Sequence, residues 1–362
     1  MSVTLRVAAG VLALVLQLVV LDAAIRTFLL PRVAQVRLSR FVARAVSMVF
    51  HALTRRARTY RLRDRVLSLY PSIVLLSYQT TWLALSAVAF ALAFFSAGVR
   101  NFLAALRISG SSLFTLGTSP AHGGSQSVLQ FVEAGVGLTL LALLIAFIPT
   151  LYSGFQRREV SVSRLSVRSG IPATPWGILE IAKSVESFEL LDELWREWEQ
   201  WFIELGETHT TLPILNYYRS PDRNQTWFSA AVSVLDAAAL YNAAVDMAVS
   251  PTAGLCIRSG WLTLRQLAQY FRIPYPETFD GTESIRISRE EFEQVLARLE
   301  RGGVPILADH EVAWRDFVGW RVNYDAIVES GYQLFDCPRV TWRDADNLPL
   351  VKPSNRRGHS ER

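Results

Sequence analysis

The sequence is poor in several residue types, and each scarcity excludes a class of protein. Only two cysteines occur among the 362 residues, Cys256 and Cys337, and they do not form a CxxC pair. A disulfide-stabilised scaffold is therefore excluded, and we expect both cysteines to be reduced thiols in a cytosolic domain. The chain also lacks a glycine-rich phosphate loop, an HExxH pair and a GxSxG elbow. These are the motifs of common nucleotide-binding proteins, zinc proteases and serine hydrolases.

Charged residues are also scarce, and they avoid particular stretches. They make up 19% of the chain, against 51% hydrophobic residues, and the mean hydropathy of +0.22 is high for a soluble protein. The net charge of +5 comes from arginine, because Lys183 and Lys352 are the only lysines. At this length, the composition fits a membrane part followed by one soluble domain. We expect no nucleic-acid partner.

Three stretches are apolar and long enough to cross about 30 Å of hydrocarbon, which takes roughly 20 helical residues. They lie within 1–31, at 70–98 and at 134–155. The first contains Asp22 and Arg26 near one end, whereas the other two carry no charged residue. The sequence therefore predicts an all-α membrane protein with three transmembrane helices.

The arginines that flank these stretches predict the orientation of the chain. Residues 32–65 contain ten arginines and a single acid, Asp64. Because cytoplasmic segments carry an excess of positive charge, the amino terminus is expected outside and this block inside. Arg157 and Arg158 follow the third span, so the rest of the chain is expected in the cytoplasm. In the alternative, the first stretch is a signal peptide cleaved near Ala23, but cleavage would leave the basic block outside.

The basic block also has helical periodicity. Apolar residues fall on one side of a helix, and Arg37, Arg40 and Arg44 fall on the other. Such a helix beside a membrane span tends to lie in the interface, with its arginines on anionic lipid headgroups. The sequence thus predicts a basic interfacial helix at 32–65 with membrane lipids as partners. In the alternative, this helix packs on the cytosolic domain.

The connection between the second and third spans contains a short apolar segment at 101–114. This segment is too short to cross the bilayer, but it is long enough for a half-helix of roughly 20 Å. Thr115, Leu116, Gly117, Thr118 and Ser119 follow it.

A glycine in this position permits close backbone approach, and rings of carbonyl oxygens can replace the hydration shell of a monovalent cation. The carboxyl end of a half-helix also favours a cation. We therefore predict a re-entrant pore helix and a selectivity filter at 115–119. The alternative is an ordinary outer loop rich in serine and glycine.

Several motifs around this segment resemble the two-helix pore module of the potassium channel superfamily. The resemblance, from about Arg65 to Val249, is carried by Ser109-Gly110-x-x-x-Phe114-Thr115-Leu116-Gly117, Glu133-Ala134-Gly135-x-Gly137, Pro149-x-Leu151-Tyr152-x-x-Phe155-x-Arg157-Arg158-Glu159, and the run from His209 through Pro213, Tyr217-Tyr218-Arg219-Ser220 and Asn224-Gln225 to Trp227. In particular, the chain resembles bacterial potassium-channel-like proteins with an extra amino-terminal transmembrane helix and a helical cytosolic domain. The resemblance implies a pore module at 66–158 and a homotetramer around a central filter.

The predicted filter departs from the superfamily pattern Thr-x-Gly-aromatic-Gly-Asp. Thr118 stands at the aromatic position, Ser119 at the second glycine and Pro120 at the acid. A serine where glycine geometry is needed would be strained or would follow another path. The resemblance therefore implies a channel for potassium or sodium ions with weak selectivity. A non-conducting pseudo-channel, acting as a membrane scaffold or sensor, is the alternative.

The third span contains three candidate bending points for gating. Gly135, Gly137 and Pro149 can each interrupt a regular helix. Pro149 is the favoured gate because it lies near the predicted cytosolic end. In the alternative, the glycines allow close helix packing.

The sequence after the third span predicts a helical cytosolic domain at 159–337 and a disordered tail at 338–362. Helices are expected at Trp176–Glu207, Trp227–Val249, Thr252–Phe271, Arg289–Arg301 and His310–Leu334. The second of these could be a fourth span, but Asp236 and Asp246 favour a buried helix. Ser288 and Glu291 form a predicted capping box.

No catalytic constellation emerges from this domain, so we expect no enzymatic activity and no cofactor. His209, His310, Asp309 and Glu311 make only a weak metal site, because successive residues of a helix point in different directions. The only expected metal is the permeating cation at the filter. An unknown cytosolic partner or ligand remains open.

Overall fold

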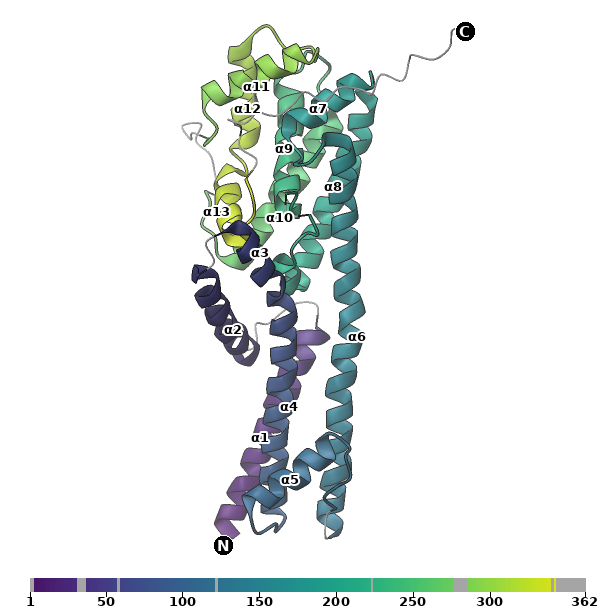
Figure 1. The fold of residues 1–362 in the computed structure, drawn as a ribbon, viewed down its shortest axis with the longest axis vertical. Helices are drawn as coiled ribbons and strands as arrows, with labels where there is room; N and C mark the ends of the chain where they lie inside the picture. Colours follow the sequence, from purple (N-terminus) through teal and green to yellow (C-terminus); the bar gives the residue numbers. More distant parts are fainter. Residues whose placement is uncertain are drawn as a thin grey trace, which may run out of the picture. The chain divides into compact units, whose positions relative to one another are not determined.

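The computed structural model is helical throughout the part of the chain that it describes (Figure 1). This part comprises residues 3–30, 37–56, 59–120, 123–222, 224–276, 285–339 and Trp342. The chain forms two compact units, Met1–Ser153 and Gly154–Arg362. The predicted all-α fold class is confirmed at this level.

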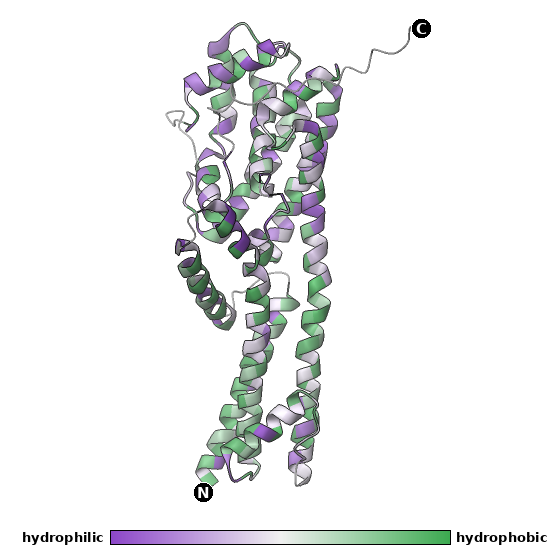
Figure 2. Ribbon diagram, viewed as in Figure 1, coloured by the Kyte–Doolittle hydropathy of each residue, from purple (hydrophilic) through white to green (hydrophobic). Residues whose placement is uncertain are grey.

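The first unit contains the apolar helices. Its elements are α1 (Val3–Phe28), α2 (Arg37–Arg56), α3 (Tyr60–Ser68), α4 (Tyr70–Ser96), α5 (Phe102–Leu113) and the start of α6 (Gly124–Ser169). Three stretches are long and apolar enough to cross a membrane: α1, the α3–α4 stretch Tyr60–Ser96, and α6. Figure 2 shows hydrophobic residues along α1, α4 and the first part of α6. The three predicted apolar helices are thus present, and the third is much longer than predicted.

Small residues allow α1 and α4 to approach closely. A Cβ atom at Gly10 would lie 2.9 Å from the Ser96 hydroxyl, so the glycine is needed for this contact. Farther along, Ala23 and Ala24 of α1 pack with Trp82 of α4, all at zero exposure. Small residues at such contacts allow van der Waals packing to hold apolar helices together. α4 is thereby a fixed support for the elements that pack on its other sides.

The second unit is built around a fully buried helix. It contains the end of α6, then α7 (Pro175–Ser184), α8 (Glu189–Thr211), the 3₁₀ helix η1 (Pro213–Tyr217), α9 (Trp227–Ala244), α10 (Pro251–Phe271), α11 (Arg289–Arg301), α12 (His310–Arg321) and α13 (Asp325–Phe335). Every residue of α9 except Asn242 is buried, and α7, α10, α12 and α13 pack on it. The prediction of a buried helix is therefore confirmed for Trp227–Ala244, but its predicted end at Val249 is wrong because residues 246–249 follow the helix and are exposed. The capping box of Ser288 and Glu291 is also present at the start of α11.

Two helices that were predicted to be continuous are each divided in the structure. The prediction of a single helix over Trp176–Glu207 is wrong, because α7 ends at Ser184 and α8 begins at Glu189. Glu186 adopts a left-handed conformation with φ of 54°, and its amide donates to the Lys183 carbonyl. This local hydrogen bonding terminates α7. The predicted single helix His310–Leu334 is also wrong, because α12 ends at Arg321 and α13 begins at Asp325 after a short turn.

Trp342 lies within the range that was expected to be a tail, and it is part of the core. Its ring packs 6.2 Å from Trp176 and 5.2 Å from Phe317, measured between centroids. Its indole nitrogen donates to Asp236 at 3.4 Å. Only 6% of the residue is exposed. The packed second unit therefore extends at least to this residue, and most of the remaining predicted tail lies outside the described residues.

We predict that Trp342→Ala destabilises the second unit by about 3–5 kcal/mol, because a buried aromatic side chain is removed and a cavity remains. Thermal unfolding of the detergent-solubilised chain, followed by tryptophan fluorescence, measures the effect. Arg339→Ala, which alters a half-exposed neighbour, is the control and should change the melting temperature little. Equal melting temperatures for Trp342→Ala and the wild type would contradict the packing of this segment.

Candidate functional site

α5 is the short helix on which the predicted filter depends. It has 12 residues, so it is about 18 Å long and cannot cross a bilayer alone. The Asn101 side chain caps its first turn by accepting from the Leu103 amide at 2.9 Å. Ala105 is fully buried against Phe90 and Phe94 of α4. The structure thus holds this short helix along the side of α4.

The carboxyl end of α5 is closed by two crossed hydrogen bonds. The Leu116 amide donates to the Ser111 carbonyl at 2.8 Å, and the Thr115 amide donates to the Ser112 carbonyl at 3.0 Å. This pair of bonds is a Schellman motif, which requires a left-handed residue where the helix ends. Thr115 is that residue, with φ of 54°.

A threonine in this conformation is unusual. Glycine normally occupies it, and a left-handed backbone costs a residue with a Cβ atom roughly 1–2 kcal/mol. A β-branched residue there is a genuine outlier. Such strained residues gather at functional sites, where the surrounding structure holds them in place. Thr115 is therefore the residue of this loop that most strongly indicates a function.

The five predicted filter residues form one continuous loop beyond α5. Gly117 is also left-handed, with φ of 68°, whereas Leu116 between the two is not. The sign of φ thus alternates from Phe114, at −94°, through Gly117. Leu116 is 64% exposed in the single chain. Residues 115–117, called here the lower part of the loop, are exposed in the single chain.

The upper part of the loop, Thr118 and Ser119, is hydrogen-bonded to α5 and α6. The Ser119 amide donates to the Ser111 hydroxyl of α5 at 3.1 Å, and the Thr118 hydroxyl donates to the same oxygen at 3.3 Å. The Gln130 side chain of α6 donates to the Ser119 carbonyl at 2.9 Å. The sequence interpretation missed Ser111 and Gln130. Both are polar residues within otherwise apolar stretches, and this feature of the sequence could have indicated a role at the loop.

The three predicted bending points of α6 differ in their surroundings. A Cβ atom at Gly137 would overlap the Leu113 carbonyl oxygen of α5, so this glycine permits close packing there. A Cβ atom at Gly135 would meet nothing within 4 Å. Pro149 is exposed, and α6 continues through it to Ser169. The close-packing alternative therefore describes the contact at Gly137.

The three predicted lipid-contacting arginines lie on α2, whose surface has three sectors. Arg37, Arg40 and Arg44 are all exposed on one sector. The second sector is also exposed but apolar, with Phe41, Met48, Val49 and Leu53. The third packs inward with Val42 and Phe50.

Both ends of α2 are attached to apolar helices. The Ser39 hydroxyl is 2.9 Å from the Thr27 hydroxyl of α1, and the Phe50 ring packs 5.2 Å from Tyr70 of α4. Thr27 lies in the last turn of α1, and Tyr70 begins α4. α2 therefore lies at the level where both apolar helices have these ends.

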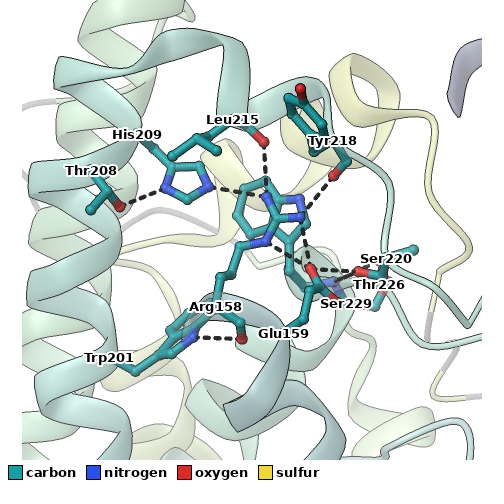
Figure 3. Close-up of polar contacts among 11 residues, drawn as sticks. Arg158, Glu159, Trp201, Thr208, His209, Leu215, Tyr218, Ser220, Thr226 and Ser229 are labelled. Carbon is teal, nitrogen blue, oxygen red and sulfur yellow. Dashed lines mark hydrogen bonds and ion pairs between the residues drawn. The ribbon is translucent and has the colours of Figure 1, made fainter. Parts of the chain in front are cut away.

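A second cluster of polar residues surrounds the end of α6 (Figure 3). Arg158 is 3% exposed and pairs with Glu159 at 2.7 Å. Its guanidinium donates to the Leu215 carbonyl at 2.9 Å, to the Tyr218 carbonyl at 2.8 Å and to a His209 ring nitrogen at 3.1 Å. In the sequence, Arg158 was a marker of orientation and part of a motif, with no predicted partner. A buried, fully bonded guanidinium instead joins the end of α6 to the segment that follows α8.

The tautomer of His209 follows from these contacts. An arginine only donates hydrogen bonds, so Nε2 of His209 accepts from Arg158. The Thr208 hydroxyl donates to the Glu204 carbonyl at 2.6 Å and lies 3.0 Å from Nδ1, so Nδ1 carries the proton. Burial and the adjacent Arg158 charge lower the pKa of His209 well below its usual value. His209 is therefore neutral in the folded chain.

Residues of the weak metal site predicted from the sequence make other contacts in the structure. Asp309 is the N-cap of α12 and accepts from the Glu311 and Val312 amides. His310 lies 2.7 Å from Glu293 of α11. Within the described residues, no group of three or more histidine, cysteine, aspartate or glutamate side chains is placed to hold a metal ion.

Comparison with models of known protein families, with curated proteins and with solved structures found no match to this chain. The evidence for a function therefore lies in the loop at 115–119 and in the polar cluster around Arg158.

We predict that Thr115→Gly stabilises the chain by about 0.5–1 kcal/mol. The glycine removes the strain of the left-handed threonine, and the larger freedom of glycine in the unfolded chain offsets part of this gain. Thr118→Gly is the matched control, because Thr118 is not left-handed and its hydroxyl bonds Ser111. We expect it to lower the melting temperature. If Thr115→Gly also lowers the melting temperature, the threonine is not strained as described.

We also predict that the stability of the second unit falls as the pH drops below about 6.5. In that range the unfolded chain binds a proton at His209 that the folded chain does not bind, so unfolding is favoured by up to about 1.4 kcal/mol per pH unit. The variant His209→Gln retains an acceptor for Arg158 and cannot titrate. Melting temperatures from pH 7 to pH 5 should therefore fall less for this variant than for the wild type. Parallel pH profiles would show that His209 is already protonated when folded.

Proposed function

We propose that the chain is a subunit of a homotetrameric channel for monovalent cations in a bacterial inner membrane. The observation that carries this proposal is the short helix α5, which ends at a strained left-handed threonine directly before an exposed loop. In this interpretation α5 is a re-entrant half-helix between the spans α4 and α6. Its carboxyl end carries partial negative charge, which favours a cation beyond it.

The backbone of the loop supports an ion-coordinating role for its lower part. Thr115 and Gly117 are left-handed and Leu116 between them is not, and in this interpretation the carbonyl oxygens of these residues face one side. Four copies of such a row around an axis would form carbonyl rings that replace a cation's hydration shell. The resemblance to the potassium channel superfamily, carried by these same residues, implies the same arrangement.

The upper part of the loop supports weak selectivity. The Ser119 carbonyl accepts from Gln130 of its own chain, so this oxygen is directed toward α6. It is therefore a weaker ion ligand than a carbonyl oxygen that accepts no hydrogen bond. Fewer carbonyl rings leave fewer sites at which potassium and sodium can be discriminated. The same contact favours the second candidate function, a non-conducting scaffold or sensor with a pore-like fold.

The exposed face of α6 supports assembly with further copies. In the single chain, large apolar residues of α6 remain exposed: Val128, Phe131, Val132, Leu138, Leu141, Ile145, Ile148 and Tyr152. An exposed apolar patch of this length marks contact with lipid or with another protein surface. In a tetramer, part of this face would line the centre or contact the neighbouring subunit.

The basic helix α2 supports the proposed orientation. Its exposed arginine sector adjoins an exposed apolar sector, and this is the pattern of a helix that lies in a membrane interface. Arginines favour the cytoplasmic side. We therefore place α2 on anionic headgroups of the inner leaflet, the amino terminus outside and the second unit in the cytoplasm.

The proposal predicts a passive flux of monovalent cations through liposomes that contain the purified chain, with a potassium-to-sodium ratio near one. The double variant Thr118→Tyr with Ser119→Gly restores the aromatic residue and the second glycine of the superfamily pattern and should raise this ratio. Ser125→Gly, an exposed site at the start of α6, is the control and should leave the ratio unchanged. Absence of flux in all three proteins would instead favour the non-conducting scaffold.

A further inference from the structure

Glu133 is the only charged residue in the apolar part of α6. No other aspartate, glutamate, lysine or arginine occurs from Gly124 to Gln156, and Glu133 is fully buried. Acidic residues at such positions are costly and are retained where they have a function. None of the sequence predictions assigned a role to this side chain.

The carboxyl group of Glu133 is bound to the middle of α5. Its Oε1 atom contacts the Ser109 hydroxyl, and the same hydroxyl lies 2.8 Å from the Ala87 carbonyl of α4. A serine hydroxyl has one proton to donate. Two oxygen atoms at hydrogen-bond distance without a proton between them repel each other. One of the two contacts therefore requires a proton that Ser109 does not supply.

Only Glu133 can supply the second proton. The Ala87 carbonyl is an acceptor and has none, so Ser109 donates to Ala87 and the carboxyl group donates to Ser109. The other carboxyl oxygen, Oε2, is buried and has no hydrogen-bond partner among the residues that the structure describes. An ionised carboxylate with one oxygen in that position would be a buried charge without compensation. The two observations independently require the neutral acid.

No cation compensates a charge at Glu133 within the described surroundings. α4 contains no aspartate, glutamate, histidine, lysine or arginine, and its Tyr78 stacks on Trp82. The only charged residue of α5, Arg107, is exposed, as is Arg6 near the start of α1. The carboxyl group is therefore surrounded by neutral groups on each helix packed against it.

We propose that Glu133 is a positioning residue that acts as a carboxylic acid. It donates to Ser109, which donates to Ala87, and this line of two bonds clamps α5 between α6 and α4. One turn farther along α6, Gly137 lies against the Leu113 carbonyl at the end of α5. The clamp therefore fixes the helix whose end carries the loop at 115–119. Its effect on ion passage rests on the proposed function, whereas the clamp itself does not.

Loss of the proton would release the clamp. An ionised Glu133 can only accept, so Ser109 would turn toward it and leave the Ala87 carbonyl. The folded chain is stabilised by the bound proton, and this contribution is lost as the pH rises far enough to remove it. Glutamine at this position retains an N–H donor for Ser109 and cannot ionise. Leucine retains the volume but donates nothing.

The test compares the full-length wild type with E133Q and E133L in mild detergent from pH 6 to pH 10. We expect E133Q to match the melting temperature of the wild type at pH 6. As the pH rises, the wild type should lose several degrees that E133Q retains. E133L should melt lower than both at pH 6. Infrared spectra at pH 6 should contain a carboxylic-acid carbonyl band that is present in the wild type and absent from E133Q.

Three outcomes would overturn the inference. The first is an E133Q variant that melts as low as E133L at pH 6, because glutamine retains both a donor and an acceptor and the site would then need the carboxylate charge. The second is the same alkaline loss in the wild type and E133Q, and the third is identical infrared spectra. These readouts do not depend on conduction. A chain without cation flux but with the expected melting profiles would refute the channel and leave the clamp intact.

Discussion

The end of α5 is the constraint on which the first unit depends. A helix that stops among apolar neighbours leaves its last carbonyl groups without partners, and each must be satisfied locally. The two crossed bonds from Thr115 and Leu116 satisfy the Ser112 and Ser111 carbonyls, but they force a threonine into a conformation that glycine normally adopts. Everything around α5 then holds it in place: Phe90 and Phe94 of α4 along its side, Gly137 at its end, and Glu133 at its middle.

The same logic explains why the loop after α5 has two unlike parts. Residues Thr115, Leu116 and Gly117 are exposed. At Thr118 and Ser119 the chain is bonded to Ser111 and Gln130. The superfamily pattern that the sequence resembles has an aromatic residue and a second glycine at these two positions. In this chain the bond from Gln130 engages the Ser119 carbonyl oxygen instead.

Sequence periodicity and charge were sufficient for the coarse fold but not for the site. Long apolar stretches predicted the three long apolar helices, and Ser288 with Glu291 predicted the start of α11. The breaks after Ser184 and Arg321 were missed because apolar periodicity continues across them, while the interruption depends on one left-handed residue or a short turn.

The roles of Glu133 and Arg158 were missed for a different reason. Each appeared in a motif, but their function depends on partners distant in the sequence, Ser109 for one and His209 for the other. Trp342 was assigned to a tail because polar residues surround it, and only the tertiary packing against Trp176 shows otherwise.

The most direct test of the central claim is electron cryo-microscopy of the full-length chain extracted in mild detergent. The account predicts particles with fourfold symmetry, in which the four loops at 115–119 meet around one axis and the carboxyl ends of the four α5 helices point toward it. Ion density on that axis beside Thr115 and Gly117 would place the cation where the backbone indicates. Monomers, or an oligomer whose loops face away from the symmetry axis, would contradict the account.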